Sequence, residues 1–123
     1  MTDNSHVITG TEVENYLYAM LPDRDLVLQE MEREAKEREI PIVGPVVARV
    51  LYQYARLIGA KTVFELGSAI GYSTLWWAYA VGQGGTVHYT DGSQANADEA
   101  RAYFERAGVA DRIKIHIGDA LEM

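Results

Sequence analysis

Four residues of one short segment could together bind a charged ligand. The run VFELGSAIGYS (residues 63–73) holds an acid, two glycines and a hydroxyl: Glu65, Gly67, Gly71 and Ser73. Gly67 permits a tight turn with positive φ and a close approach of the backbone to a ligand. Gly71 lets a helix begin next to the strand, with its free N–H groups directed at the ligand. Those donors and the Ser73 hydroxyl suit a carboxylate or a phosphate.

The spacing of the glycines and the position of Glu65 favour one kind of ligand. A dinucleotide-binding turn has the pattern G-x-G-x-x-G, whereas here Ala69 stands at the middle position and the last glycine is displaced. Glu65 would repel a pyrophosphate and attract a cationic amino group. The turn therefore favours an amino-acid moiety, although a hydrogen-bonded acid at a strand end accounts for Glu65 equally well.

Two further acids follow the next two predicted strands. Asp91 comes after residues 86–90, and Asp119 comes after residues 112–117. Ligands of open parallel sheets bind beyond the carboxyl ends of the strands, where an acid about twenty residues after the glycine turn meets ribose hydroxyls. One such acid is usually a turn former, but three acids, Glu65 included, in register with the glycine turn indicate a site. An ammonium group, a ribose and an adenine amine on one ligand would satisfy all three acids.

Hydrophobic periodicity predicts the elements that position these residues. Strands are expected at 62–66, 86–90 and 112–117, with helices at 72–81 and from Asn96, capped with Glu99, to about Gly108. Strand and helix in alternation predict two right-handed βαβ units and a parallel sheet. Earlier helices are expected at 11–21, 23–39 and 46–58, separated by proline breaks. The fold class is α/β, with a mobile tail at 1–10 and helices over 11–60 ahead of a βαβαβ unit at 61–123.

Aromatic and histidine side chains in this unit are predicted to be structural. Trp76, Trp77 and Tyr79 lie on the helix that packs on the sheet, where core packing is favoured over a substrate platform. His88 and His116 alternate with apolar residues within strands, with no metal-ligand or nucleophile pattern beside either.

Composition limits the class of protein. The chain has 123 residues, a formal net charge of −7 and no cysteine. The absence of cysteine excludes disulfides and thiol chemistry and fits a cytoplasmic protein, and the acidity argues against nucleic-acid binding. No apolar run approaches the roughly 20 residues of a membrane span, and the first residues have no signal-peptide pattern.

The segment Glu65-Leu66-Gly67-x-x-x-Gly71-Tyr72-Ser73 resembles motif I of the cation-dependent O-methyltransferases, the group of catechol and caffeoyl-CoA O-methyltransferases. The resemblance extends over roughly residues 16–121, with PIVGP, LIGAKTVFELG and AGVADRIKIHIGDAL in the family's order. It implies S-adenosylmethionine as cofactor and a Rossmann-like class I methyltransferase fold, truncated to three parallel strands in the order 3-2-1.

The resemblance also implies a role for each site residue at the methionine end of the cofactor. Val43 and Gly44 would line this end, and Ser73 would bind its carboxylate. The turn at Gly67 would face the amino-acid portion, with Glu65 close by.

At the adenosine end, the resemblance implies that Asp91 holds the ribose hydroxyls. Asp119 and the backbone of Ala120 would meet the adenine. The GSQAN segment that follows Asp91 departs from the acidic residue and proline usual in the family.

The same resemblance implies that the catalytic and metal-binding residues come after Met123, so none is assigned within the chain. A Mg-type divalent cation would require that second half. Strand 62–66 would be central in the family's sheet and is here left as an apolar edge, which recruits other chains. We therefore expect a fragment of a longer enzyme, or a homo-oligomer formed through this edge.

Two functions remain open at this point. The first is methyl transfer from S-adenosylmethionine to a hydroxyl of a small, aromatic or similar acceptor, with this chain supplying the cofactor-binding half. The alternative is a non-catalytic module that binds the cofactor or self-associates. Nucleotide-dependent oxidoreduction is disfavoured by the glycine spacing, and neither nucleic acid nor a membrane is expected as partner.

Overall fold

Three helices precede an alternation of strands and helices in the computed structural model, which describes residues 10–122. The predicted tail, residues 1–10, lies outside the described residues except for Gly10. The elements are α1 (Thr11–Ala19), α2 (Leu26–Glu37), α3 (Gly44–Leu57), β1 (Thr62–Phe64), α4 (Tyr72–Val81), β2 (Thr86–Asp91), α5 (Gln94–Arg106), the 3-10 turn η1 (Ala110–Arg112), β3 (Ile113–Ile117) and the 3-10 turn η2 (Ala120–Glu122).

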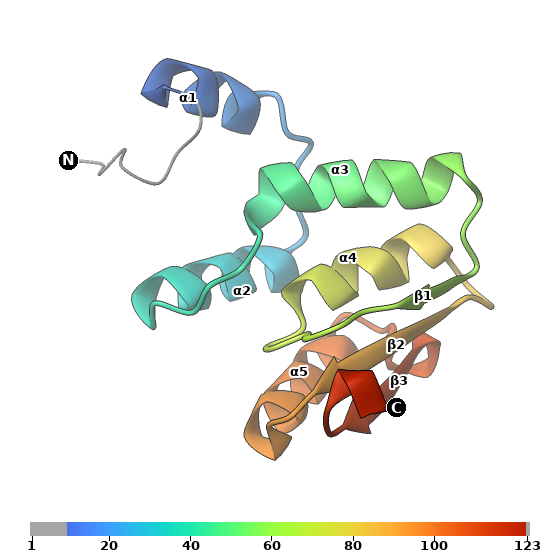
Figure 1. Cartoon of the computed structure of the whole chain (residues 1–123). Helices are drawn as coiled ribbons and strands as arrows, with labels where there is room; N and C mark the ends of the chain where they lie inside the picture. Colours follow the sequence, from blue (N-terminus) through green and yellow to red (C-terminus); the bar gives the residue numbers. More distant parts are fainter. Residues whose placement is uncertain (1–9, 123) are drawn as a thin grey trace.

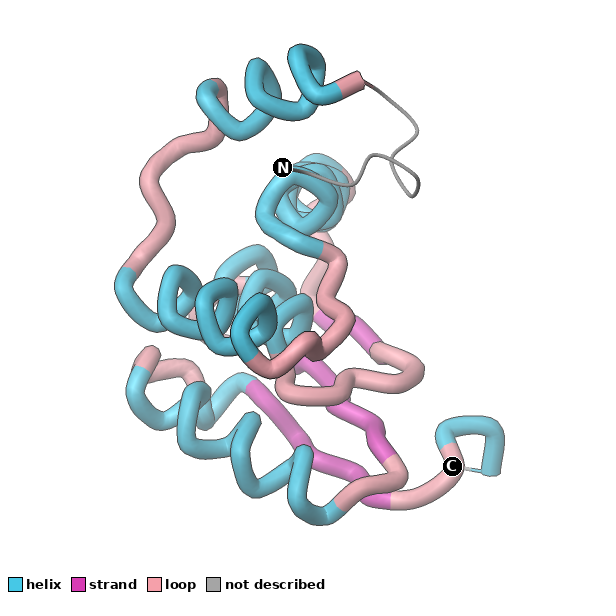
Figure 2. The backbone as a smooth tube through the Cα atoms, turned by 90° about the vertical axis from the view of Figure 1, so that its left-hand side faces the viewer, coloured by secondary structure: helices cyan, strands magenta, loops and turns pink. Residues whose placement is uncertain are grey.

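The three strands form a parallel sheet in the order β1-β2-β3, which confirms the predicted topology. Val87 pairs with Val63 on one side and with Ile113 on the other, and this row packs into the hydrophobic core. The next row of side chains must face the opposite way because successive residues of a strand alternate. Figure 2 shows the helices on one side of the strands, and no helix of residues 10–122 covers the other side.

Helix α4 lies between α3 and the sheet, and its sequence explains this central place (Figure 1). YSTLWWAYAV is apolar on all sides, as expected for a helix that is buried all round. Leu75 is fully buried, and Trp76 is only 5% exposed. The prediction that Trp76 is a core residue is confirmed, while Trp77 and Tyr79 are partly buried against the core.

Three helix starts differ from the predicted ones. Helix α2 begins at Leu26 and not at residue 23, because the Asp25 carboxylate accepts a hydrogen bond from the Leu28 N–H over 2.8 Å and caps the helix there. Helix α5 begins at Gln94 and not at Asn96, because the Ser93 hydroxyl accepts a hydrogen bond from the Asn96 N–H over 3.1 Å and caps the helix two residues earlier. Helix α3 begins at Gly44 and includes Pro45 in its first turn. Proline is tolerated there because the first N–H groups of a helix have no intrahelical partner.

The ends of β1 and α1 also differ from the predicted ones. β1 ends at Phe64, two residues earlier than predicted, although the Glu65 N–H still donates to the carbonyl of His88 over 3.0 Å. Helix α1 ends at Ala19 and has no buried residue. Figure 1 shows it beside α3, away from the sheet. None of the helices within residues 10–122 has the length and apolar character needed to cross a membrane.

Candidate functional site

Three backbone N–H groups of the glycine turn between β1 and α4 donate hydrogen bonds to the end of β2. The N–H of Gly67 donates to Thr90 Oγ1 over 3.1 Å, and the N–H of Ser68 donates to the Thr90 carbonyl over 2.7 Å. The N–H of Ala69 donates to Asp91 Oδ1 over 3.1 Å. The turn is therefore fixed by neighbouring protein groups and has a defined shape without a ligand.

The shape of the turn requires left-handed backbone at Gly67 and Ala69, with φ of 75° and 50°. Ala69 stands where a dinucleotide-binding turn would have its middle glycine. Its unfavourable conformation is held by the Asp91 carboxylate at its N–H and by the Tyr89 hydroxyl, which donates to its carbonyl. Residues with positive φ persist where the surroundings fix them, commonly at functional sites.

Gly71 is needed for packing as well as for the start of α4. Its φ is 89°, and a Cβ atom added there would lie 2.6 Å from Cζ of Phe104 and 3.0 Å from Cβ of Ala100. The start of α4 thus lies directly against α5. The close contact between α4 and α5 therefore also requires a glycine at position 71, and this contact could not be predicted from the sequence.

The Glu65 carboxylate receives three hydrogen bonds from α4. Thr74 Oγ1 donates over 2.5 Å and Trp77 Nε1 over 3.1 Å, and the Ser73 hydroxyl donates to the same carboxylate. Glu65 is half-buried, so these donors replace the water that a carboxylate would otherwise bind. The strand-end acid is thereby tied to the first turn of the helix.

This network limits what Ser73 can do. A serine hydroxyl carries one hydrogen, and here that hydrogen is given to Glu65. In this arrangement the Ser73 oxygen can accept a hydrogen bond from an ammonium group. To donate to a ligand carboxylate, it must turn away from Glu65.

Asp91 fixes two loops at once. Its Oδ1 accepts from the turn, at the Ala69 N–H, and its Oδ2 accepts from the Ser93 N–H over 3.0 Å and from Asn96 Nδ2 over 3.1 Å. The predicted ribose-binding acid therefore joins the glycine turn to the start of α5. A carboxylate has about four acceptor positions, so room for a further donor is left.

Asp119 and Ala120 lie at the same edge of the sheet, after β3. The Gly118 N–H donates to the Asp91 carbonyl over 2.9 Å, so the ends of β2 and β3 are joined. Asp119 is exposed and accepts from the Leu121 N–H over 2.9 Å, while Ala120 is half-buried and begins η2.

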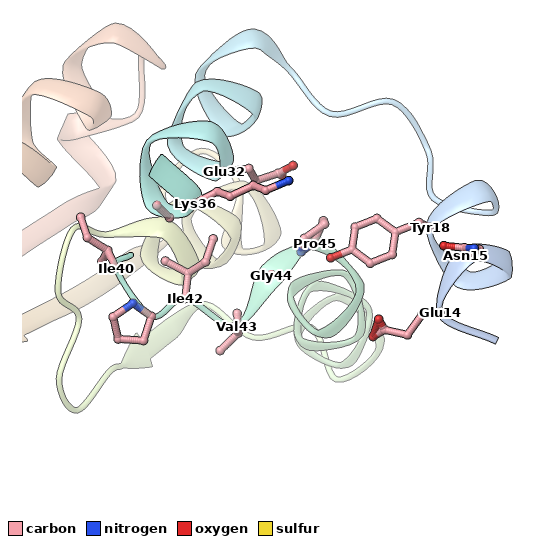
Figure 3. A pocket seen from close by; sticks show the side chains of 12 residues that line it. Glu14, Asn15, Tyr18, Glu32, Lys36, Ile40, Ile42, Val43, Gly44 and Pro45 are labelled. Atoms are coloured by element: carbon pink, nitrogen blue, oxygen red, sulfur yellow. The ribbon is translucent and has the colours of Figure 1, made fainter. Parts of the chain in front are cut away.

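Two cavities adjoin the turn on either side of residues 41–43. One, of about 340 Å³, lies between this segment and the turn, and it is lined by the predicted residues Val43, Gly67 and Ser73. The second, of about 740 Å³, is lined by Gly44 and by residues of α1 and α2 (Figure 3). Glu65, Gly71, Asp91, Asp119 and Ala120 line neither cavity. Glu65 and Asp91 are joined to the smaller cavity through lining residues, because they accept hydrogen bonds from the Ser73 hydroxyl and from the Ala69 N–H.

The sequence analysis did not assign a role to Tyr72, Tyr89 or Thr90. Tyr72 lines the smaller cavity, and its hydroxyl donates to Glu32 of α2 over 2.8 Å. Burial and then the charges of Asp91 and Glu65 raise the pKa of Tyr89, so its hydroxyl remains a donor to the turn at neutral pH. The one signal in the sequence was the alternation of side chains along β2, which places Tyr89 on the face of the sheet that the helices cover.

His88 and His116, treated separately in the sequence analysis, lie together on the side of the sheet that no described helix covers. His88 Nδ1 and His116 Nε2 are 3.0 Å apart, and the two rings stack with their centroids 5.2 Å apart. Burial, the neighbouring His116 and Lys114 lower the pKa of His88. Over residues 10–122, no group of three or more histidine, aspartate or glutamate side chains is placed to hold a metal ion.

A parallel sheet with a glycine turn after its first strand, and with acids at the ends of the next two, is the arrangement of the α/β class, in which ligands bind at the carboxyl edge of the sheet. Residues 20–123 match the model of the O-methyltransferase family, and the chain belongs to that family. This confirms the resemblance found in the sequence.

Relatives and solved structures agree with this assignment. The chain is 32% identical over 113 residues to a catechol O-methyltransferase of Mycobacterium tuberculosis. It aligns with the crystal structure of a methyltransferase from Geobacter sulfurreducens with a TM-score of 0.86 and 33% identity, over 94% of this chain and 61% of that one. An O-methyltransferase from Bacillus cereus in complex with SAH gives a TM-score of 0.81 and 32% identity, over 91% and 52%.

The alignment with the mycobacterial relative covers 90% of this chain and 51% of the relative. The chain thus spans about half the length of the relative that it matches. The predicted Rossmann-like methyltransferase fold, limited to three strands, is confirmed by these alignments and by the sheet order.

Proposed function

We propose that this chain forms the cofactor-binding half of an S-adenosylmethionine-dependent O-methyltransferase whose acceptor is a hydroxyl of a small, aromatic or similar molecule. One observation carries the proposal. The glycine turn is fixed against the end of β2, and a cavity of about 340 Å³ opens between the turn and Val43. The relative from Bacillus cereus, with the same fold, was crystallised with SAH.

The residues present fit the methionine end of such a cofactor. Val43 and the turn at Gly67 line the cavity, and Gly44 follows at the start of α3. The Glu65 carboxylate, with Ser73 hydrogen-bonded to it, supplies negative charge beside an ammonium group. Within residues 10–122, no side chain caps the first turn of α4, after Gly71, so its N–H groups can serve a ligand carboxylate.

The adenosine end would lie across the ends of β2 and β3. We assign the ribose hydroxyls to Asp91, which keeps an unused acceptor position, and the adenine to Asp119 and the backbone of Ala120. The hydrogen bond between Gly118 and Asp91 supports this assignment because it holds the two strand ends side by side.

When bound, S-adenosylmethionine supplies an electrophilic methyl group. The chain's own contribution would be to hold the cofactor and keep water from it. The described residues do not fit the divalent cation that the family resemblance implies, because they contain no suitable group of ligands. Residues 11–123 would then form one incomplete α/β domain. We place the protein in the cytoplasm because it has no cysteine.

Calorimetric titration of the chain with S-adenosylmethionine and SAH tests the proposal. We expect binding of both, weakened tenfold or more in Asp91→Asn because a charge-assisted hydrogen bond to a ligand contributes about 1.5–3 kcal/mol. Asp98→Asn, an exposed change on α5, is the matched control and should bind as the unaltered chain does. A folded chain that binds neither compound would refute the proposal.

One observation favours self-association as a second function. β1 has a strand partner only on its β2 side among the described residues, and Phe64 and Leu66 are 49% and 61% exposed. We infer that this edge pairs with another copy of the chain. Sedimentation velocity should detect an oligomer that the double variant Phe64→Lys, Leu66→Lys disrupts. Leu121→Lys, which charges an exposed leucine elsewhere, should leave it intact, and a monomer at high concentration would contradict the inference.

A further inference from the structure

Glu32 of α2 reaches the start of α4 through Tyr72. The Tyr72 hydroxyl donates to Glu32 Oε2 over 2.8 Å, and Tyr72 is the first residue of α4, directly after Gly71. Tyr72 lines the cavity of about 340 Å³ at the glycine turn, whereas Glu32 lines the cavity of about 740 Å³ (Figure 3). The side chain of Tyr72 is therefore a wall of the smaller cavity, and its hydroxyl is held from α2.

Arg24 fixes the Glu32 carboxylate. The Nε atom of Arg24 donates to Oε1 over 2.9 Å and to Oε2 over 2.7 Å. The side chains of Arg24 and Glu32 are only 22% and 17% exposed. Such a pair does not rearrange easily, because a partner that moved away would leave the other charge unpaired and mostly withdrawn from water. Glu32 is therefore a fixed acceptor for Tyr72.

The Tyr72 ring is itself enclosed. It is 2% exposed, and it meets the Trp76 ring edge to face with the centroids 6.5 Å apart. Burial and the hydrogen bond to Glu32 raise the pKa of Tyr72, so its hydroxyl remains a donor at neutral pH. A turn of the ring would break this hydrogen bond and leave a buried hydroxyl without its partner, which is unfavourable.

Helix α2 holds α4 at both ends. The Tyr79 hydroxyl donates to Asp25, the residue that caps α2. Tyr79 lies about two turns beyond Tyr72 along α4. Tyr72 lines the cavity at the glycine turn and Tyr79 does not. Of these two contacts, the one between Tyr72 and Glu32 is therefore the one that can act on a ligand in that cavity.

The place of Tyr72 in α4 decides what its movement would change. The N–H groups of Tyr72 and Ser73 are among the first of the helix and have no intrahelical acceptor. Both groups would move with the Tyr72 ring, because they belong to the same helical turn. Glu32 thus fixes the direction in which α4 offers its free donors to the cavity.

Building on the function proposed above, we infer that Glu32 is a positioning residue of the cofactor cradle, acting through Tyr72 on the methionine end of a bound S-adenosyl compound. Glu32 does not line the smaller cavity. It holds the wall and the N–H groups that face the ligand. Its replacement should therefore weaken ligands that carry the amino-acid portion and spare those that lack it.

The contact can be followed without a ligand. The chain has two tryptophans, Trp76 and Trp77, and the Trp76 indole N–H lies at the Tyr72 oxygen. In a proton–nitrogen correlation spectrum, Glu32→Gln should shift the Trp76 indole signal, because the Tyr72 hydroxyl loses its ionised acceptor. Trp77→Phe assigns the two indole signals. Glu37→Gln, which removes an exposed charge at the end of α2, should leave the Trp76 signal in place.

Two ligands separate positioning from a general loss of structure. SAH carries the amino-acid portion, and 5′-methylthioadenosine is a thioether of the same nucleoside without it. In calorimetric titration, Glu32→Gln should bind SAH about fivefold more weakly, a smaller loss than the tenfold or more expected for a residue that touches the ligand. Its binding of 5′-methylthioadenosine should be unchanged. Glu37→Gln should bind both compounds as the unaltered chain does.

A double-mutant cycle tests the route through Tyr72. Tyr72→Phe keeps the ring and removes only the hydroxyl, so it isolates the same contact even where Glu32→Gln fails to fold. It should weaken SAH binding to a similar extent. Glu32→Gln added to Tyr72→Phe should then have little further effect, because changes that remove one shared contact are not additive. Thermal unfolding followed by circular dichroism identifies a variant that is not folded.

Four results would overturn the proposal. They are an unmoved Trp76 signal in Glu32→Gln, an SAH affinity that neither variant lowers, equal losses for SAH and 5′-methylthioadenosine, and losses from the two changes that add in full. Each would contradict the role of Glu32 while the unaltered chain still binds SAH. An unaltered chain that binds neither S-adenosylmethionine nor SAH would instead contradict the proposed function itself.

Discussion

The two faces of the sheet differ in how deeply their side chains are buried and in the partners that these side chains contact. On the face covered by the helices, Val87 and Tyr89 are fully buried, and the glycine turn beyond them is fixed by hydrogen bonds to the end of β2. On the other face, Phe64 is half exposed, and His88 and His116 have mainly each other as partners. The covered face thus carries a rigid candidate site, while the other offers surface for contact. Three changes test this difference.

The largest effect should come from Gly71→Ala. The added Cβ would lie 2.6 Å from the Phe104 ring and would also have to accept a φ of 89°. Overpacking costs about 1–3 kcal/mol, and the left-handed backbone costs an alanine roughly 1–2 kcal/mol more. We expect urea unfolding to show a loss of about 3 kcal/mol.

Gly67→Ala is the matched control for this change. Gly67 has a similar φ of 75°, but nothing lies within 4 Å of the position of an added Cβ. Only the backbone term applies, and a loss of about 1 kcal/mol is expected. Equal losses in the two variants would mean that the contact between α4 and α5 is not rigid.

A smaller effect is expected from Glu65→Gln. The amide retains one acceptor but turns an N–H₂ group towards the donors of Ser73, Thr74 and Trp77. The mismatch should lower the free energy of unfolding by about 1–2 kcal/mol. The Trp77 indole signal should also move, because its acceptor changes. Glu105→Gln, an exposed change on α5, should do neither; an unshifted Trp77 signal in Glu65→Gln would contradict the network.

Much of this covered face could be predicted because local signals agree there. The bounds of α4 match the predicted residues 72–81, since glycines stand at both ends. The donors to Glu65 could also have been found, because Ser73 and Trp77 are four residues apart and share one side of a helix. The start of α5 was misplaced because Ser93 and Asn96 are both good caps, and only the structure shows that Ser93 is the one used.

The remaining features depend on contacts between distant segments. Thr90 binds the turn because the register puts it beside residues 67–68, and no spacing rule identifies such a threonine. A cavity of about 370 Å³ at Arg49 exists because α2, α3 and α4 meet around it. Periodicity predicts that a helix has an apolar face, but it does not say where two such faces leave a gap.

The smallest effect should come from the pH dependence of the other face. The contact between His88 and His116 requires one ring nitrogen to donate and the other to accept, so protonation of both rings breaks it. Burial, His116 and Lys114 hold the pKa of His88 below its ordinary value of 6.5. The unfolded chain therefore binds more protons than the folded chain just below pH 6.5. Stability must fall as the pH drops through that range towards the lowered pKa.

His88→Gln isolates this contribution because glutamine does not titrate. Urea unfolding of both chains at intervals from pH 7.5 to 5.5 should give a steeper loss of stability for the unaltered chain. The two curves should approach each other at the acid end. His116→Gln should flatten the curve less, because it removes the neighbour that opposes the charge on His88 but leaves the burial that is the larger cause of the lowered pKa. Parallel curves for all three chains would mean that the pKa of His88 is not lowered in the folded chain, and that this face holds no fixed contact.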